Sequence, residues 1–307
     1  MTSRRACLVA ALLSAILSCR DEKPAGTDSV VIDPPVPPVV AAPDPSTGWD
    51  EESAGPAMFI SIPDNSAAAM VVIPSLTDST IDPSAFDIGQ LNDVSVELFS
   101  RRGLSGSTVL AVKPDSARVE GCISWPQARL AEIPPEPWRI GFVKGVVAPL
   151  PLDSLETMRS VDSASVTTEL ARISSALAEG DDPAFRGLPF TVREAYRFTV
   201  GQTTVLAGDV VRKINEEANP REEHLLVVAE RSSAPGGTYS PVYHTRVAGR
   251  EDEVRTNEIL GAVRFVKINR PALVIAFDYE DGGRVALLQR INAGEWRITW
   301  RSAYTGC

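Results

Sequence analysis

Four cysteines and two histidines are the side chains of this 307-residue chain best suited to nucleophilic, redox or metal chemistry. None of them forms the closely spaced pairs that zinc sites, redox motifs or metalloprotease helices need. The chain also lacks the glycine-rich loops that bind phosphates and the serine elbow of hydrolases. The sequence therefore predicts no catalytic residue, no metal ligand and no cofactor. The six residues are Cys7, Cys19, Cys122, Cys307, His224 and His244.

Two clusters of carboxylates are further candidates, one around Asn219-Pro220 and the other before Gly282-Gly283. Paired carboxylates can serve as acid and base when their pKa values are pushed apart, and carboxylates on a loop can bind calcium. The first cluster is also typical of a solvated turn, and the second lacks the remaining ligands of a calcium loop and fits a hairpin. The members are Glu216, Glu217, Glu222 and Glu223, and then Asp278, Glu280 and Asp281.

Residues 1–19 have the organisation of an export signal. Arg4 and Arg5 precede an apolar run over residues 6–17. This run is shorter than the roughly 20 apolar residues of a spanning helix, and it fits the apolar core of a secretory signal peptide.

The end of this segment, Ile16-Leu17-Ser18-Cys19, resembles the lipobox of bacterial lipoproteins. The resemblance implies cleavage after residue 18 and acylation of Cys19 on its sulfur and on its new amine. Two or more acyl chains anchor a protein stably, whereas one does so only marginally. The alternatives are an ordinary signal peptide with an incidental cysteine, and an uncleaved anchor. Arg20 stands where an aspartate would commonly retain the protein at the inner membrane, which favours the outer membrane of a two-membrane cell.

Cys122 and Cys307 are the cysteines left after removal of the signal and lipidation of Cys19. In an oxidising compartment two remaining cysteines predict one disulfide, which would tie the end of this sequence to its middle. The alternative is two free thiols that never meet.

The charge balance excludes one class of partner. Removal of residues 1–18 takes away Arg4 and Arg5 and leaves 28 basic and 40 acidic side chains, a net charge of −12. Such a surface repels polyanions, which argues against binding of nucleic acid or anionic lipid through bulk charge.

Composition divides the chain into a signal (1–18), a lipidated cysteine with a proline-rich tether (19–57) and one globular region (58–307). The tether cannot bury a core and favours extended chain, because prolines recur through it. The globular region is divisible into a β-rich part (58–150) and a part with a helix and a β-meander (151–307). The tether prolines are Pro24, Pro34, Pro35, Pro37, Pro38, Pro43, Pro45 and Pro56.

The pattern of apolar residues predicts an α+β fold, mostly antiparallel β, with one long amphipathic helix near 154–178. Asp153 and Glu156 form a capping-box pattern at the start of this helix, and its apolar face is Val166, Leu170, Ile173 and Leu177. This spacing predicts packing on a sheet, with docking to a partner as the alternative.

Strand patterns fill most of the remaining globular region. Turns at 280–283 and 292–294 predict a meander, and residues 272–277, apolar on both faces, predict a covered central strand. In the last strand, alternation predicts that Trp296, Ile298 and Trp300 share one face. Residues 205–214 fit either a helix or a strand.

A weak internal repeat relates residues 210–229 to residues 263–277. The second copy, with its meander to Trp300, resembles over about 45 residues a blade of the FG-GAP/VCBS-type bacterial propellers, which are built from four or more blades. The segment Lys267-Ile268-Asn269-Arg270 replaces the aspartate-rich calcium loop of those blades, so the resemblance implies no calcium site. We expect an open or two-layer arrangement.

Trp125 and Trp138 lie in proline-rich surroundings. They could form an exposed platform for a glycan or peptide, or they could cover the core. Together these features predict a membrane-anchored lipoprotein that acts as a non-catalytic binding or structural module of the cell envelope. Its partners would be the membrane, through lipid, and an envelope protein or glycan. The alternatives are an envelope hydrolase with an unrecognised site and a lipoprotein subunit of an export or assembly complex.

Overall fold

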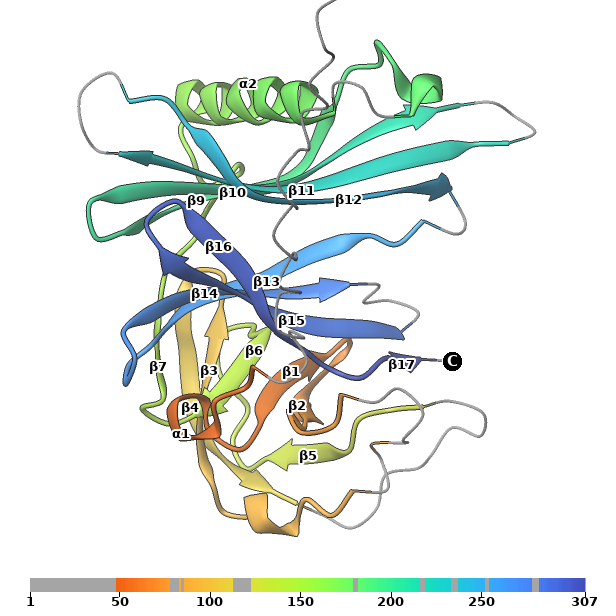
Figure 1. Cartoon of the computed structure of the whole chain (residues 1–307). Coiled ribbons are helices and arrows are strands. Elements are labelled where there is room, and N and C mark those ends of the chain that lie inside the picture. The colour runs from red at the N-terminus through yellow and green to blue at the C-terminus, as the bar shows by residue number, and fades with distance from the viewer. Residues whose placement is uncertain are drawn as a thin grey trace, which may run out of the picture. The chain divides into compact units, whose positions relative to one another are not determined.

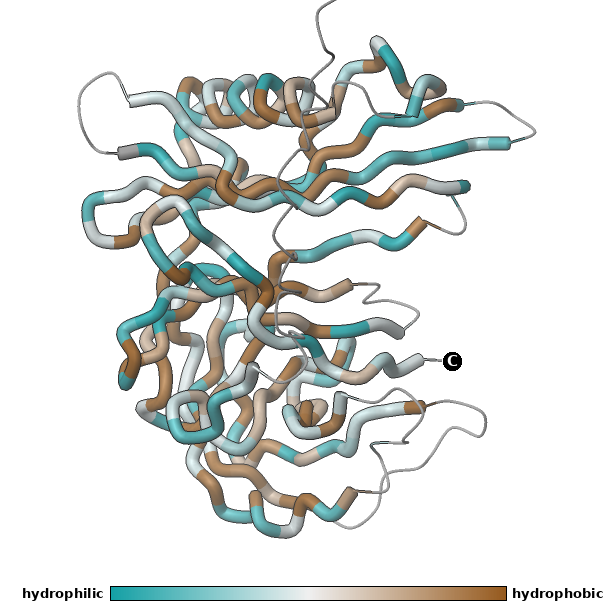
Figure 2. The backbone as a smooth tube through the Cα atoms, in the orientation of Figure 1, coloured by the Kyte–Doolittle hydropathy of each residue, from teal (hydrophilic) through white to brown (hydrophobic). Residues whose placement is uncertain are grey.

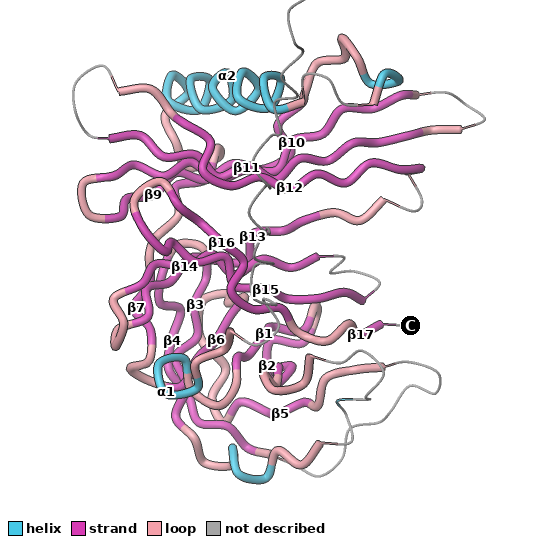
Figure 3. Tube along the Cα trace, in the orientation of Figure 1, coloured by secondary structure: helices cyan, strands magenta, loops and turns pink. Residues whose placement is uncertain are grey.

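The computed structural model describes residues 48–77, 83, 86–112, 123–178, 182–215, 219–232, 237–251, 254–277 and 282–306. Antiparallel strands dominate these residues, and a single long helix accompanies them (Figure 3), which confirms the predicted fold class. The predicted signal, the lipobox, most of the tether and all four cysteines lie outside the described residues.

Six antiparallel strands close into a barrel in the order β1-β2-β5-β4-β3-β6. β1 and β2 form a hairpin, with Asp64 in the left-handed region at its turn. β3 and β4 form a second hairpin that turns at Arg101-Arg102, so Gly103 begins a strand. The barrel strands are Met58–Ile62 (β1), Asn65–Val72 (β2), Ser95–Ser100 (β3), Gly103–Ala111 (β4), Gln127–Leu130 (β5) and Ile140–Val143 (β6).

Two further antiparallel sheets follow the barrel in the chain. The helix-side sheet has the order β12-β11-β10-β9-β8 and comprises Asp153–Ser154 (β8), Thr191–Val200 (β9), Thr203–Ile214 (β10), Arg221–Ser232 (β11) and Ser240–Arg250 (β12). The middle sheet has the order β16-β15-β14-β13-β7 with β17 paired to β15. It comprises Val147–Pro149 (β7), Asn257–Phe265 (β13), Arg270–Phe277 (β14), Gly282–Asn292 (β15), Glu295–Arg301 (β16) and Thr305–Gly306 (β17).

The middle sheet is buried on both faces, as predicted for residues 272–277. Ala272 and Val274 pack into the barrel core, whereas Leu273 and Ile275 pack against the helix-side sheet. Figure 1 shows the resulting layers, with α2, the helix-side sheet, the middle sheet and the barrel in succession. The two copies of the weak repeat lie in different sheets, because residues 210–229 belong to β10–β11 and residues 263–277 to β13–β14.

Edge-to-face contacts between aromatic rings stabilise the packing of these layers. The rings of Phe142 in the barrel and Phe265 in β13 meet edge to face, with centroids 5.9 Å apart. Phe198 on β9 meets Trp296 on β16 in the same way at 6.3 Å. Each such pair adds about 0.5–1.5 kcal/mol beyond its burial of apolar area.

The long helix α2 spans Ser160–Leu177 and packs on the helix-side sheet through Val166, Leu170 and Ile173. Figure 2 shows brown and paler or teal segments alternating along its turns, as expected of an amphipathic helix. The predicted start near 154 is wrong, because Asp153 and Ser154 instead pair with β9 as β8. A turn then leads to Arg159, which caps the helix without a side-chain hydrogen bond.

The predicted common face of the last strand holds for Trp296 and Ile298 but is wrong for Trp300. Trp296 packs between the two sheets, but Trp300 packs into the barrel core, where its Nε1 donates to the carbonyl of Pro74 at 3.0 Å. A bulge at Thr299 causes the change, since Leu287 pairs with Trp300 while Leu288 pairs with Ile298. An extra residue reverses the face on which the following side chains lie.

Residues before position 58 also belong to the packed body. The ring of Trp49 lies 4.9 Å from that of Trp300, and its Nε1 donates to the carbonyl of Gly55 at 2.8 Å. A short helix at Glu51–Ala54 (α1) follows, capped by the carboxylate of Asp50. The ordered body is therefore present at Trp49, before the predicted end of the tether.

Candidate functional site

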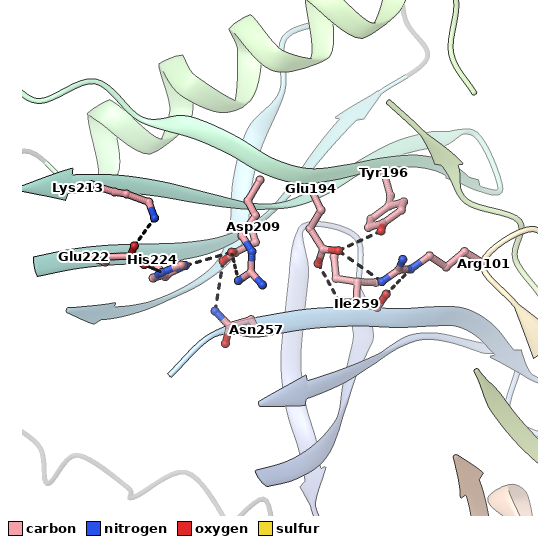
Figure 4. A network of polar contacts seen from close by, with 10 residues as sticks. Arg101, Glu194, Tyr196, Asp209, Lys213, Glu222, His224, Asn257 and Ile259 are labelled. Carbon is pink, nitrogen blue, oxygen red and sulfur yellow. Dashed lines mark hydrogen bonds and ion pairs between the residues drawn. The ribbon is translucent and has the colours of Figure 1, made fainter. Parts of the chain in front are cut away.

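His224 on β11 lies between two carboxylates (Figure 4). Its Nε2 is 2.8 Å from Oε2 of Glu222, and its Nδ1 is 3.3 Å from Oδ2 of Asp209. Only 2% of His224 is exposed, and Asp209 is fully buried. Burial opposes the charged ring, but the hydrogen bonds and charges of Asp209 and Glu222 outweigh it and raise the pKa of His224. The geometry favours an imidazolium that donates from both nitrogens.

This chain of contacts continues at both ends. Lys213 forms an ion pair with Glu222. Burial favours the neutral form of Glu222, but Lys213 and His224 outweigh burial and lower the pKa of this carboxyl group. At the other end, Nδ2 of Asn257 lies 3.4 Å from Oδ1 of Asp209, and Nη1 of Arg193 lies 3.5 Å from Oδ2. A bulge in β9 at Arg193 breaks the pairing with β10, and bulges redirect side chains in this way.

A second set of contacts connects the barrel to both sheets. The carboxylate of Glu194 accepts hydrogen bonds from the hydroxyl of Tyr196 (3.0 Å) and the backbone N–H of Ile259 (2.9 Å). Arg101, from the β3–β4 turn, reaches the same carboxylate at 3.4 Å and donates Nε–H to the carbonyl of Ile259 at 2.7 Å. Arg101 and Arg139 also pair with Glu258. Burial outweighs these partners and raises the pKa of Glu194.

On the opposite face of the helix-side sheet, Glu223 is fully buried between two guanidinium groups. Arg212 approaches its carboxylate at 2.7 Å and Arg246 at 2.8 Å. The guanidinium of Arg212 also lies over the rings of Phe190 and Phe185, at 4.8 and 5.5 Å from their centroids. This arrangement holds Phe190 and the 3-10 turn Pro183–Phe185 (η4) against the sheet.

Glu230 forms a comparable cluster at the far end of the same sheet. Its carboxylate accepts from Arg290 at 2.6 and 2.9 Å, from Nε1 of Trp296 at 2.6 Å and from the backbone of Gly294 at 3.0 Å. Burial favours the neutral acid, but these donors outweigh it and lower the pKa of Glu230.

The chemistry open to these buried groups is limited, because they bond to one another. A general base needs a free nitrogen or oxygen within reach of a substrate proton, whereas both nitrogens of His224 face carboxylates. Among the buried side-chain atoms described, only Oγ of Ser174 and Oδ1 of Asn257 lack a partner. The network is therefore suited to holding layers in register.

An open polar cleft of about 270 Å³ lies between α2 and the helix-side sheet. Its helix wall carries two carboxylates, and the guanidinium groups of Arg197 and Arg231 come from β9 and β11. Arg231 lies 4.5 Å from the centroid of Tyr239, which is itself largely buried. The lining residues are Asp162, Ser165, Val166, Glu169, Arg197, Arg231, Gly237, Thr238 and Tyr239.

The structure buries the two tryptophans considered for an exposed platform. Trp125 and Trp138 are 3% and 4% exposed and belong to the barrel core. Nε1 of Trp138 lies 3.4 Å from the carbonyl of Ser66. Both rings therefore cover the core, and the alternative prediction of an exposed platform is wrong. Cys19, Cys122 and Cys307 lie outside the described residues.

The two described carboxylates near Asn219-Pro220 do not lie in a solvated turn. Glu222 and Glu223 are buried and point to opposite faces of β11, so they do not form one acidic pair. His224 occupies a satisfied buried position, and His244 is exposed. Alternation of Glu222 and His224 was the only local signal of the network. The remaining members, Glu216, Glu217, Asp278, Glu280 and Asp281, lie outside the described residues.

Comparison with family models, with curated proteins and with solved structures finds no match to this chain. Within the described ranges, no three histidine, cysteine or acidic side chains are placed to hold a metal ion. No helix in this part of the chain is long and apolar enough to cross a membrane. The functional argument therefore rests on the geometry of the network and the cleft.

Proposed function

We propose that this chain is an extracytoplasmic module, anchored to a membrane by lipid on Cys19, that binds or holds an envelope partner without performing chemistry. The observation that carries the non-catalytic assignment is the enclosure of His224, whose ring nitrogens both face carboxylates while 2% of the residue is exposed. A histidine held in this way has no nitrogen to offer a substrate.

The contacts between layers support a rigid body. Arg101 joins the barrel to the middle sheet, and Glu194 joins that sheet to the helix-side sheet. Sliding of one layer past another would separate such a pair and leave a buried charge without its partner, which is energetically costly. The layers therefore resist sliding. A rigid body can hold a binding surface such as the α2 cleft in fixed geometry without paying ordering entropy at each encounter.

A tether between Cys19 and Trp49 fits this role. About 30 residues of proline-rich chain span up to roughly 90 Å at 3.1 Å per residue. The body would therefore reach partners well away from the bilayer, and the outer membrane is favoured in a two-membrane cell.

Pairing near Cys122 and Cys307 supports the proposed disulfide. The next residue after Cys122, Ile123, exchanges both backbone hydrogen bonds with Gly306, at 2.9 and 2.8 Å. Ile123 directly follows Cys122 in the chain, and Gly306 directly precedes Cys307, so the described neighbours of the two cysteines are hydrogen-bonded to each other.

Acyl labelling of the Cys19→Ala variant tests the proposal. We expect this variant to lose the label, to leave the membrane fraction and to accumulate as unprocessed precursor. Cys7→Ala is the matched control, because Cys7 lies inside the signal and outside the lipobox. If Cys19→Ala were still labelled and processed like Cys7→Ala, the anchor would be refuted.

A further inference from the structure

The two carboxylates on the helix wall of the α2 cleft already form ion pairs with arginines of α2 and of its N-cap. Nε of Arg159 lies 3.0 Å from Asp162, and Nη2 of Arg172 lies 2.7 Å from Glu169. Both are pairs three residues apart, the spacing at which helical side chains meet. Each acid therefore has its nearest cationic partner on the helix side, and Glu169 attracts Arg231 across the cleft only as a weaker, longer-range partner.

Within the described residues, the guanidinium groups on the sheet wall have no hydrogen-bond acceptor. Among the described residues, Arg231 has no carboxylate within 4 Å; its guanidinium lies over the ring of Tyr239 and attracts Glu169 from a longer distance. Arg197 has one distant ion pair, to Asp153 at 3.7 Å, and donates to no closer acceptor in the same part of the chain. Within those residues the hydroxyl of Tyr239 also has no hydrogen-bond partner, although only 8% of the residue is exposed.

Such a set of donors is suited to an oxyanion. Arginine offers paired N–H groups that match the geometry of carboxylates and phosphates, and a phenol hydroxyl adds a further donor. The cleft volume of about 270 Å³ is smaller than the roughly 300–1,000 Å³ of pockets that hold drug-sized ligands. The ligand must therefore be small.

We propose that the α2 cleft is a binding site for a small anion that presents a carboxylate or phosphoryl group to Arg197, Arg231 and the hydroxyl of Tyr239. The inference rests on the proposed role as a binding module and names the ligand class of that module. The helix wall, with Ser165 and the paired carboxylates Asp162 and Glu169, would face the remainder of the ligand.

Titration calorimetry of the full-length protein tests this site, with succinate and inorganic phosphate as probes at constant ionic strength. We expect one of them to bind at one site per chain. Arg197→Gln and Arg231→Gln should each weaken binding at least about tenfold, because each removes charge-assisted hydrogen bonds. Tyr239→Phe should weaken binding about two- to tenfold while retaining the ring under Arg231. This variant provides the test of the site if an arginine variant does not fold.

Arg129→Gln is the charge-matched control, since Arg129 is an exposed residue of the barrel strand β5. It should bind the probe as the unaltered protein does. Response to succinate alone assigns a carboxylate ligand, and response to phosphate alone assigns a phosphoryl ligand. The inference is overturned if neither probe binds at millimolar concentration, or if the Arg197, Arg231 and Tyr239 variants all match the control. Cys19→Ala should retain the site, so loss of anchoring and loss of binding are separate results.

Discussion

The side chains of Asp209 and His224 lie on neighbouring strands and meet at 3.3 Å, with both residues almost completely shielded from solvent. Asp209 also contacts Asn257 of the middle sheet at 3.4 Å. A carboxylate in this position therefore links strands within one sheet and joins that sheet to the next.

Asp209→Asn should lower the free energy of unfolding by about 3–5 kcal/mol, because it removes the buried charge that compensates the buried His224. Urea denaturation monitored by tryptophan fluorescence measures the change. Glu52→Gln is the control, since the Glu52–Lys267 pair is exposed and should contribute less than about 1 kcal/mol. Equal effects of the two substitutions would show that Asp209 is not a structural link.

The pH dependence of stability should carry a contribution from His224. Because the folded-state pKa of His224 is raised above its ordinary value of 6.5, its stabilisation is fully present below that value. The contribution is lost as pH rises through the folded pKa. The free energy of unfolding, measured between pH 6 and pH 9, should therefore fall more steeply in the unaltered protein than in His224→Gln. Parallel curves for the two proteins would contradict a charged His224.

Gly208→Ala should destabilise the protein by about 1–3 kcal/mol, as expected for overpacking. A Cβ at this position would lie 2.7 Å from the carbonyl oxygen of Glu194 and 2.7 Å from a methyl group of Leu170. β9, β10 and α2 would have to separate to admit it. Gly249→Ala, whose nearest neighbour Val254 is 3.9 Å away, should leave the melting temperature nearly unchanged. A similar melting temperature for both variants would argue against close packing of α2 on this sheet.

A non-reducing peptide map should yield one linked pair containing Cys122 and Cys307. Reduction should then cost roughly 2–4 kcal/mol of stability, the typical contribution of a disulfide. Cys122→Ser should leave Cys307 open to alkylation. Recovery of two alkylatable thiols from the unaltered mature protein would rule out the bridge.

Local pattern was sufficient for much of the C-terminal half. The turn at residues 292–294 and the doubly apolar run at 272–277 specify a meander and a covered strand without reference to the rest of the chain. The helix was found by its apolar face, but its start was misplaced because Asp153 and Ser154 also suit a strand and here pair with β9. Competition of this kind is decided by tertiary contacts.

Non-local register explains what the sequence could not show. The single residue Thr299, by forming a bulge, sends Trp300 into the barrel core instead of beside Trp296. The partners of His224 likewise depend on which residues of β10 and β11 stand opposite each other. The cleft could not be predicted from the sequence either, because Arg197 and Arg231 come from separate strands and face a helix distant from them in the chain.

The intact mass of the mature protein, isolated from membranes without reduction, tests the proposed function most directly. We predict a chain that begins at Cys19, carries acyl groups on that residue and has two hydrogen atoms fewer than the dithiol form. A chain that begins at Met1, without lipid and with two free thiols, would contradict both the anchor and the extracytoplasmic location.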